Sequence, residues 1–135
     1  MKKKRKMIIA MSALLFIIIL SIIYILMLHE TDSVVEDFVN CIAGNVTQED
    51  VESSELYRYY NRSELYDDDV CSATANVKRI FVWHGFKHGV MCVKYDCEAF
   101  DDNGNHIYSS SNVNARWYVE KRNGRWIVTD IEEKP

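Results

Sequence analysis

The side chains in this chain that could do chemistry lie mostly in its second half. Two predicted strands, residues 90–100 and 107–121, alternate apolar and polar positions, so that their odd-numbered residues share one inward face. Hydroxyl and thiol groups on this face, with aromatic residues from elsewhere, could line a small polar pocket. The predicted lining residues are Tyr60, Trp83, Tyr95, Cys97, Ser109 and Ser111.

This predicted pocket lacks a general base. Proton-transfer enzymes use a positioned group, often a carboxylate in an apolar wall, to accept the proton. Asp96 and Glu98 have the opposite parity and share the outward face with Lys94. We therefore expect no catalytic residues. The alternative is a pocket that binds a small ligand or catalyses a reaction.

The sequence also gives no metal-ligand pattern. Its four histidines do not cluster at ligand spacing. The segment 101–105 resembles the start of a calcium loop, but its glycine, Gly104, is the fourth residue rather than the sixth. No glutamate follows at the twelfth place, where Asn112 stands. We expect a hairpin turn there, and we expect no metal and no cofactor.

Four cysteines, Cys41, Cys71, Cys92 and Cys97, could in principle form disulfides. Cys92 and Cys97 are five residues apart on one predicted strand, which places them on opposite faces and about 16 Å apart. A disulfide needs a Cα separation of about 4.4–6.8 Å, so these two should not pair. Two possibilities remain: one disulfide that includes Cys41, or four buried cysteines with free thiols.

A long apolar stretch precedes the elements that would position these residues. Met7 to Leu28 is 22 residues long and carries no charged side chain. As a helix rising about 1.5 Å per residue it would be roughly 33 Å long, against a hydrocarbon core about 30 Å thick. The sequence therefore predicts one transmembrane helix over residues 7–28.

A cleaved secretory signal is the alternative to a permanent anchor. The stretch is longer than the roughly 7–15 residues of a signal's apolar region, and bulky residues around Leu28 stand where the peptidase requires small ones. Five basic residues precede the stretch, and His29, Glu30 and Asp32 follow it. The positive-inside rule then predicts a cytoplasmic stub (1–6) and an extracytoplasmic domain (29–135) at the plasma membrane.

Charge is distributed unevenly over the predicted outer domain. Residues 29–135 carry 20 acidic and 11 basic side chains, a net charge of −9. Residues 29–72 alone hold 12 acidic and 2 basic side chains, whereas 73–135 are nearly balanced. Such an acidic surface disfavours nucleic acid and anionic lipid as partners.

The first part of the domain has helical patterns. Ser33 to Glu36 has the form of a capping box, and the apolar residues that follow fall on one helical face up to Gly44, a typical helix stop. Thr47 begins a second predicted helical segment. Leu56, Tyr59 and Tyr60 give a third, weaker periodic patch.

The rest of the chain has strand patterns over 73–84, 90–100, 107–121 and 126–131. Turn residues separate the strands, and Asn123-Gly124 favours a type I′ hairpin turn. Short turns between consecutive strands predict an antiparallel meander of four strands. Strands this long must curve, and wrapping around the apolar face of the first helix is the simplest arrangement.

Two segments carry a resemblance to a known fold. The opening helix, Ser33–Ala43, is followed at the end of the chain by a Trp-bearing strand, a tight turn, and Gly124-Arg-Trp-Ile-Val-Thr-Asp-Ile131. This arrangement resembles the nuclear-transport-factor-2-like (cystatin-like) cone, an α+β fold in which helices sit in a curved antiparallel sheet. A single span followed by such a cone also resembles bitopic subunits of conjugation and type IV secretion machines, and uncharacterised Gram-positive membrane proteins.

The predicted organisation favours a membrane-tethered, non-enzymatic binding or assembly module. The expected partners are the membrane, through a single pass, and another protein or a second copy of this chain. A small-ligand-binding or catalytic cone, with a pocket at its open end, is the alternative function.

Overall fold

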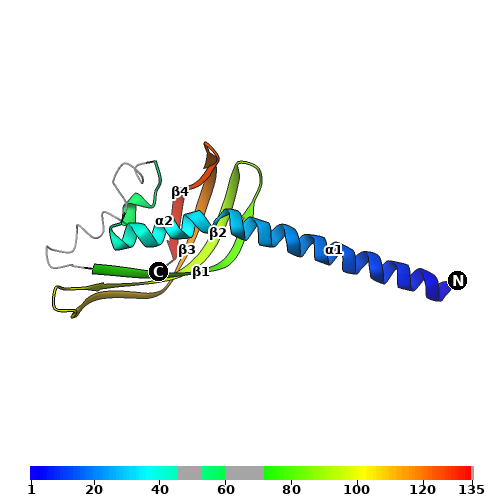
Figure 1. The fold of residues 1–135 in the computed structure, drawn as a ribbon, viewed down its shortest axis with the longest axis horizontal. Coiled ribbons are helices and arrows are strands. Elements are labelled where there is room, and N and C mark those ends of the chain that lie inside the picture. Colours follow the sequence, from blue (N-terminus) through cyan, green and yellow to red (C-terminus); the bar gives the residue numbers. More distant parts are fainter. Residues whose placement is uncertain (46–52, 60–71, 135) are drawn as a thin grey trace.

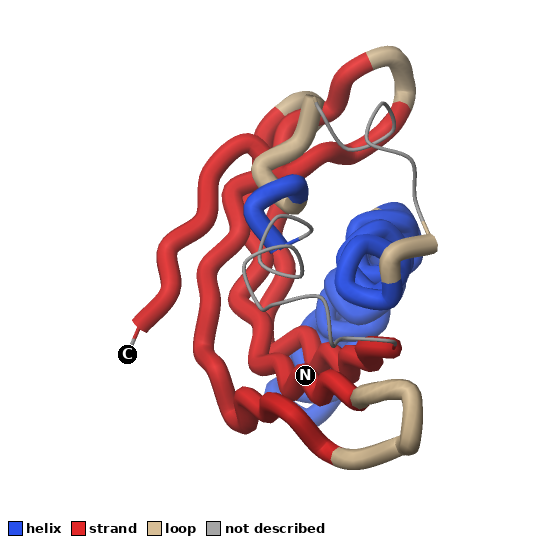
Figure 2. The backbone as a smooth tube through the Cα atoms, turned by 90° about the vertical axis from the view of Figure 1, so that its left-hand side faces the viewer, coloured by secondary structure: helices blue, strands red, loops and turns tan. Residues whose placement is uncertain are grey.

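The computed structural model describes residues 1–45, 53–59 and 72–134 (Figure 1). Two helices are followed by four strands that form one antiparallel sheet in the order β1-β2-β3-β4. This is the predicted α+β fold, and the sheet curves around one side of the helices (Figure 2). The elements are α1 (Lys2–Glu30), α2 (Asp32–Ala43), β1 (Ser72–His84), β2 (His88–Phe100), β3 (His106–Arg122) and β4 (Arg125–Lys134).

Helix α1 projects away from the sheet and exposes its apolar side chains (Figure 1). Taken together with α2, it is long and apolar enough to cross a membrane, and the rest of the chain covers none of its most apolar window. An isolated helix with apolar residues on all sides cannot be stable in water, so the composition of α1 fits a bilayer.

Helix α2 continues α1 almost without interruption, which the sequence pattern did not predict. The predicted capping box at Ser33 is not the start of the helix. Instead α2 begins at Asp32, and its N-cap residue Thr31 makes no side-chain cap hydrogen bond. The Thr31 N–H donates to the carbonyls of Met27 and Leu28, and its own carbonyl accepts from the Val34 N–H, so this one residue closes α1 and opens α2.

The C-terminal end of α2 follows the prediction. Gly44 adopts a left-handed conformation (φ 72°), and its N–H and that of Asn45 bond back to the last carbonyls of the helix. A residue with a Cβ would be strained at this φ, so glycine suits the stop. The predicted segment beginning at Thr47 lies outside the described residues.

The strands lie close to their predicted ranges, and so do the turns between them. Asn123 (φ 52°) and Gly124 (φ 77°) both have positive φ, as the predicted type I′ turn requires. On β2 the odd positions 91–99 are buried, which confirms the alternation predicted for that strand.

The alternation predicted for β3 holds only in the second half of that strand. Ala115, Trp117 and Val119 are buried as expected, but Ile107 is exposed. The register shifts between Tyr95 and Cys97, where β3 contains Asn112 at a positive φ of 55°. A bulge of this kind adds one residue to one strand and reverses which residues face inward beyond it.

The core lies between α2, the segment 53–59 and the inner face of the sheet. Phe38 and Trp117 are fully buried at its centre, and Leu56 and Tyr59 cover it from the short segment. Leu56 and Tyr59 belong to the weak periodic patch in the sequence, while Tyr60 lies outside the described residues. Trp126, Val128 and Ile131 complete the core from β4.

Candidate functional site

The structure does not gather the predicted pocket residues into one site. Tyr95 and Cys97 are buried on the inner face of β2, as predicted. Ser109 and Ser111 are exposed, because the bulge at Asn112 turns them outward, and Ser110 instead lies opposite Cys97.

Trp83 lies far from Cys97. Its side chain is 59 % exposed on the outer face of β1. Cys97 pairs with Ala75, eight residues before Trp83 on β1, which corresponds to about 26 Å along the strand. Trp83 and Cys97 therefore cannot line one small cavity.

A polar cluster of two tyrosines and a carboxylate occurs instead at the inner face. The hydroxyls of Tyr59 and Tyr95 donate to the same oxygen of Glu133, at 2.8 and 2.7 Å. Glu133 lies on β4 opposite Ala115, a buried position, so it projects inward. The expectation that inward strand positions carry no carboxylate is therefore wrong.

The sequence contained a signal for Glu133. The predicted fourth strand ended at Ile131, whereas β4 continues to Lys134. Ile131 is buried, and a strand alternates with a period of two, so extending it by two residues brings Glu133 to the same face.

The two phenols of this cluster keep their protons. Burial raises the pKa of Tyr95, and its hydrogen bond to Glu133 raises that pKa further. The pKa of Tyr59 is raised by the same two causes in the same order. Both phenols therefore act as donors at neutral pH, and the bond from Tyr59 to Glu133 fastens the segment 53–59 to the sheet.

Aromatic rings fill the space next to this cluster. The ring of Phe38 lies 4.8 Å from that of Tyr59, 5.1 Å from that of Tyr95 and 4.9 Å from that of Trp117, between centroids. These separations are typical of favourable aromatic packing. The inner face here is occupied by side chains of the domain itself.

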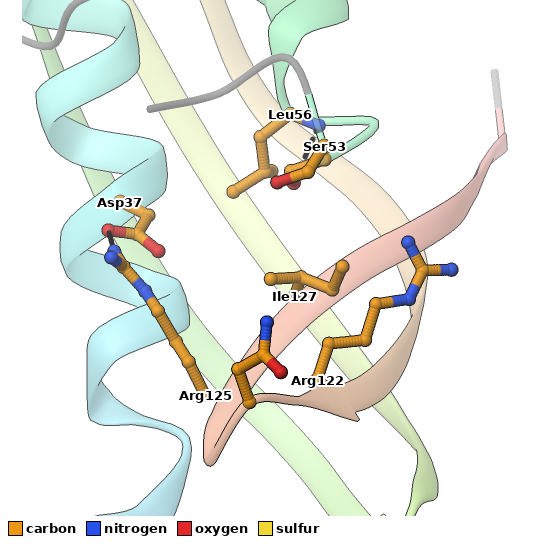
Figure 3. A pocket seen from close by; sticks show the side chains of 8 residues that line it. Asp37, Ser53, Leu56, Arg122, Arg125 and Ile127 are labelled. Atoms are coloured by element: carbon orange, nitrogen blue, oxygen red, sulfur yellow. Dashed lines mark hydrogen bonds and ion pairs between the residues drawn. The ribbon is translucent and has the colours of Figure 1, made fainter. Parts of the chain in front are cut away.

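A groove lies outside this packed region, between α2, the segment 53–59 and the β3–β4 turn (Figure 3). Its volume is about 310 Å³, at the lower end of the range for small-molecule sites. The lining residues are Asp37, Ser53, Ser54, Leu56, Arg122, Asn123, Arg125 and Ile127.

Charged side chains occupy two sides of the groove. Arg125 forms an ion pair with Asp37 across it, as Figure 3 shows. Arg122 lies at the start of the turn and pairs with Glu120 at 3.3 Å, where the Arg122 side chain is half exposed and that of Glu120 is partly buried. Two guanidinium groups provide donors for a carboxylate or a phosphate. Each already has a carboxylate partner, so an anionic ligand would have to compete with Asp37 and Glu120.

Metal coordination has no candidate in the described part of the chain, because no three His, Cys, Asp or Glu side chains there converge. Cys41 and Cys97 are buried, Cys92 is half-buried on the outer face, and Cys71 lies outside the described residues. Comparison of the chain with protein-family models, with curated proteins and with solved structures finds no match.

Proposed function

We propose that this chain is a membrane-tethered, non-enzymatic module that binds or assembles with other proteins on the extracytoplasmic side of the plasma membrane. The observation that carries the proposal is the direct passage of α1 into α2. A helix of transmembrane length continues into the helix that carries Phe38 and Cys41 into the domain core. A domain mounted in this way stays at the bilayer surface.

The joint between span and domain is fixed by hydrogen bonds. Arg79 of β1 donates to the Leu28 carbonyl at 2.6 Å and to the Thr31 hydroxyl at 3.3 Å. The same guanidinium pairs with Asp32 at 2.6 Å. Bonds from one side chain to both sides of the joint restrain the angle between α1 and the sheet. Such a module can reach only partners at the same membrane.

The filled inner face supports binding on outer surfaces rather than chemistry in a cavity. Rings of Phe38, Tyr59, Tyr95 and Trp117 occupy the place where a cone-shaped enzyme would keep its pocket. The resemblance to nuclear-transport-factor-2-like cones is compatible with a binding module but does not itself separate binding from catalysis. That fold hosts isomerases, dehydratases and binding modules, so the site and not the fold must decide.

Photo-crosslinking in the native membrane tests this proposal. A photoreactive phenylalanine analogue would replace Arg122 at the groove, with Thr74 on the outer face of β1 as the matched exposed control. We expect a discrete adduct larger than the chain itself from Arg122, and its identification by mass spectrometry would name the partner. Absence of adducts from Arg122, Thr74 and other exposed positions in native membranes would contradict an assembly role.

The groove favours one second candidate, the binding of a small anionic ligand. Arg122, Arg125 and the exposed Ser53 supply donors around a volume of about 310 Å³. Calorimetric titration of the full chain with small dicarboxylates and phosphate esters tests it. Binding that is lost in Arg125→Gln and kept in Arg116→Gln, on the outer face of β3, would favour this candidate.

A further inference from the structure

Four large apolar side chains are exposed on the outer side of β1 and at the turn that follows it. Ile80 is 55 % exposed, Phe81 47 %, Trp83 59 % and Phe86 98 %. The register between β1 and β2 shifts between Arg79 and Phe81. This bulge turns Phe81 and Trp83 outward on either side of the buried Val82, so the exposure is built into the strand.

This apolar surface lies beside the joint between α1 and α2. Arg79, before it, bonds to the carbonyl of Leu28. His84, after it, has its Nε2 atom 3.5 Å from the carboxylate of Glu30. Figure 1 shows the β1–β2 turn next to the point where α1 enters the domain. The strand therefore passes the helix at the level of residues 28–30.

The apolar part of α1 ends at this same level. Leu28 is the last residue of the uncharged stretch and packs on the domain core, while Met27 is only 9 % exposed. The domain therefore contacts the final turn of the span, with no spacer. If α1 crosses the bilayer, the headgroup layer surrounds Leu28, and Phe81 and Trp83, on the outer face of β1 at the same level, lie in that layer. Tryptophan and other amphipathic aromatics favour this depth.

Local charge agrees with a lipid surface. No Asp or Glu occurs between Ser72 and Tyr95, although residues 29–135 carry a net charge of −9. Lys87 stands in the turn next to Phe86. The β1–β2 hairpin thus carries none of the acidic character that disfavours anionic lipid for the domain as a whole. The nearby Glu30 and Asp32, at the joint, lie against His84 and Arg79.

We propose that the β1–β2 hairpin docks on the bilayer through Phe81, Trp83 and Phe86, at the headgroup level of the leaflet from which the domain emerges. This inference rests on the proposed membrane anchoring by α1. The second contact fixes the tilt of the domain and presents the groove near Arg125 to partners at a set height.

Tryptophan fluorescence of the full chain in lipid nanodiscs tests the docking. Trp117 and Trp126 are buried, so Trp83 is the tryptophan within the described residues that reaches the surface. Discs would contain phosphatidylcholine and phosphatidylglycerol with one chain per disc. We expect blue-shifted Trp83 emission, loss of quenching by iodide, and quenching by a doxyl label near the headgroup. Subtracting the spectrum of Trp83→Phe isolates the Trp83 signal.

Two further variants, both made in the Trp83→Phe background, carry the tryptophan at another position and provide the matched comparison. Phe86→Trp should behave as Trp83 does, whereas Ile107→Trp, at the opposite end of the sheet, should stay accessible to iodide. Full iodide quenching of Trp83 and of Phe86→Trp in discs would overturn the docking. Protection of these tryptophans from iodide that occurs only with two chains per disc would also overturn the docking, in favour of self-association.

Anchoring itself is checked separately on the same samples. Resistance of the chain to alkaline carbonate extraction from membranes reports α1 insertion alone. An extracted chain would refute the anchoring, and a retained chain with an iodide-accessible Trp83 would refute only the docking.

Discussion

Tyr59 and Tyr95 share one acceptor oxygen of Glu133, and this makes the domain sensitive to alkali. Burial and the bonds to Glu133 raise the pKa of both phenols above their ordinary value. A raised folded-state pKa stabilises the fold fully below the unfolded value of about 10, and that stability is lost as the pH rises above it. The free energy of unfolding should fall above pH 10 by up to about 1.4 kcal/mol per pH unit for each tyrosine.

Chemical denaturation of the full chain in nanodiscs between neutral pH and pH 12 measures this slope. Tyr95→Phe should be less stable at neutral pH but should show a shallower alkaline slope. Tyr118→Phe, on the outer side of β3, serves as the control and should keep the slope of the unaltered chain. Equal slopes in all three proteins would show that the cluster does not hold these protons.

Single residues differed in how well the sequence predicted them. The inward positions of Tyr95 and Cys97 followed from the alternation on a regular strand. Glu133 was missed because the predicted strand stopped two residues short of it. Tyr59 was recognised as a periodic apolar residue, but its bond to Glu133 spans 74 residues and no local pattern encodes such a pair.

At the scale of elements, Arg79 joins the strand β1 to both helices. Replacing it by Met should remove the bonds to Leu28, Thr31 and Asp32 and cost about 1–3 kcal/mol of unfolding free energy. The joint should also open, because Arg79 bonds to residues on both sides of it, Leu28 in α1 and Asp32 in α2. Limited proteolysis near residue 30 measures the opening.

The neighbouring variant Lys78→Met is the control for Arg79→Met, since Lys78 is exposed on the other face of β1. It should leave both stability and the cleavage rate unchanged. If Arg79→Met were cleaved no faster than Lys78→Met, the joint would not depend on this side chain.

Trp126 belongs to the closing hairpin and packs in the core. Trp126→Ala should cost about 3–5 kcal/mol and unfold most of the domain. Trp83→Ala removes an equally large ring from an exposed site and should leave far-ultraviolet dichroism unchanged in detergent. A folded, stable Trp126→Ala protein would contradict the position of this hairpin in the core.

The two faces of β2 can be compared by thiol labelling. Cys92 is half-buried on the outer face, whereas Cys97 is buried on the inner one. Cys92 should react first with a thiol reagent in the native domain, and Cys97 only on unfolding. Peptide mapping that finds equal protection of Cys92 and Cys97 would show that the strand is broken between them.

Element ranges were predictable where one local rule decides them. The Asn123-Gly124 turn and the Gly44 stop both follow from the freedom of glycine at positive φ. The bulge at Asn112 was not predictable, because it depends on how β3 pairs with the curved β2. The start of α2 at Asp32 rather than after a cap at Ser33 depends likewise on α1, because Thr31 both ends that helix and begins the next.

At the scale of the whole molecule, composition alone indicates a span and a domain. An uncharged stretch of 22 residues and the strand patterns after it predict both parts, and the structure joins them by a nearly continuous helix. Only four residues separate Leu28 from Ser33, so the sequence predicts a domain close to the membrane. The contacts that make the joint were not predictable, since they depend on Arg79 and on the packing of Leu28. The side of the membrane stays a prediction, made from the five basic residues before the span.

The most direct test of the proposed anchoring, with the domain outside the cell, is a topology measurement on intact cells or protoplasts. The chain would carry an epitope tag before Lys2 and would be exposed to added protease, with lysed cells as the control for cleavage. We expect residues after His29 to be degraded in intact cells while the tag and α1 remain protected. A protected C-terminal domain together with an accessible tag at Lys2 would contradict it.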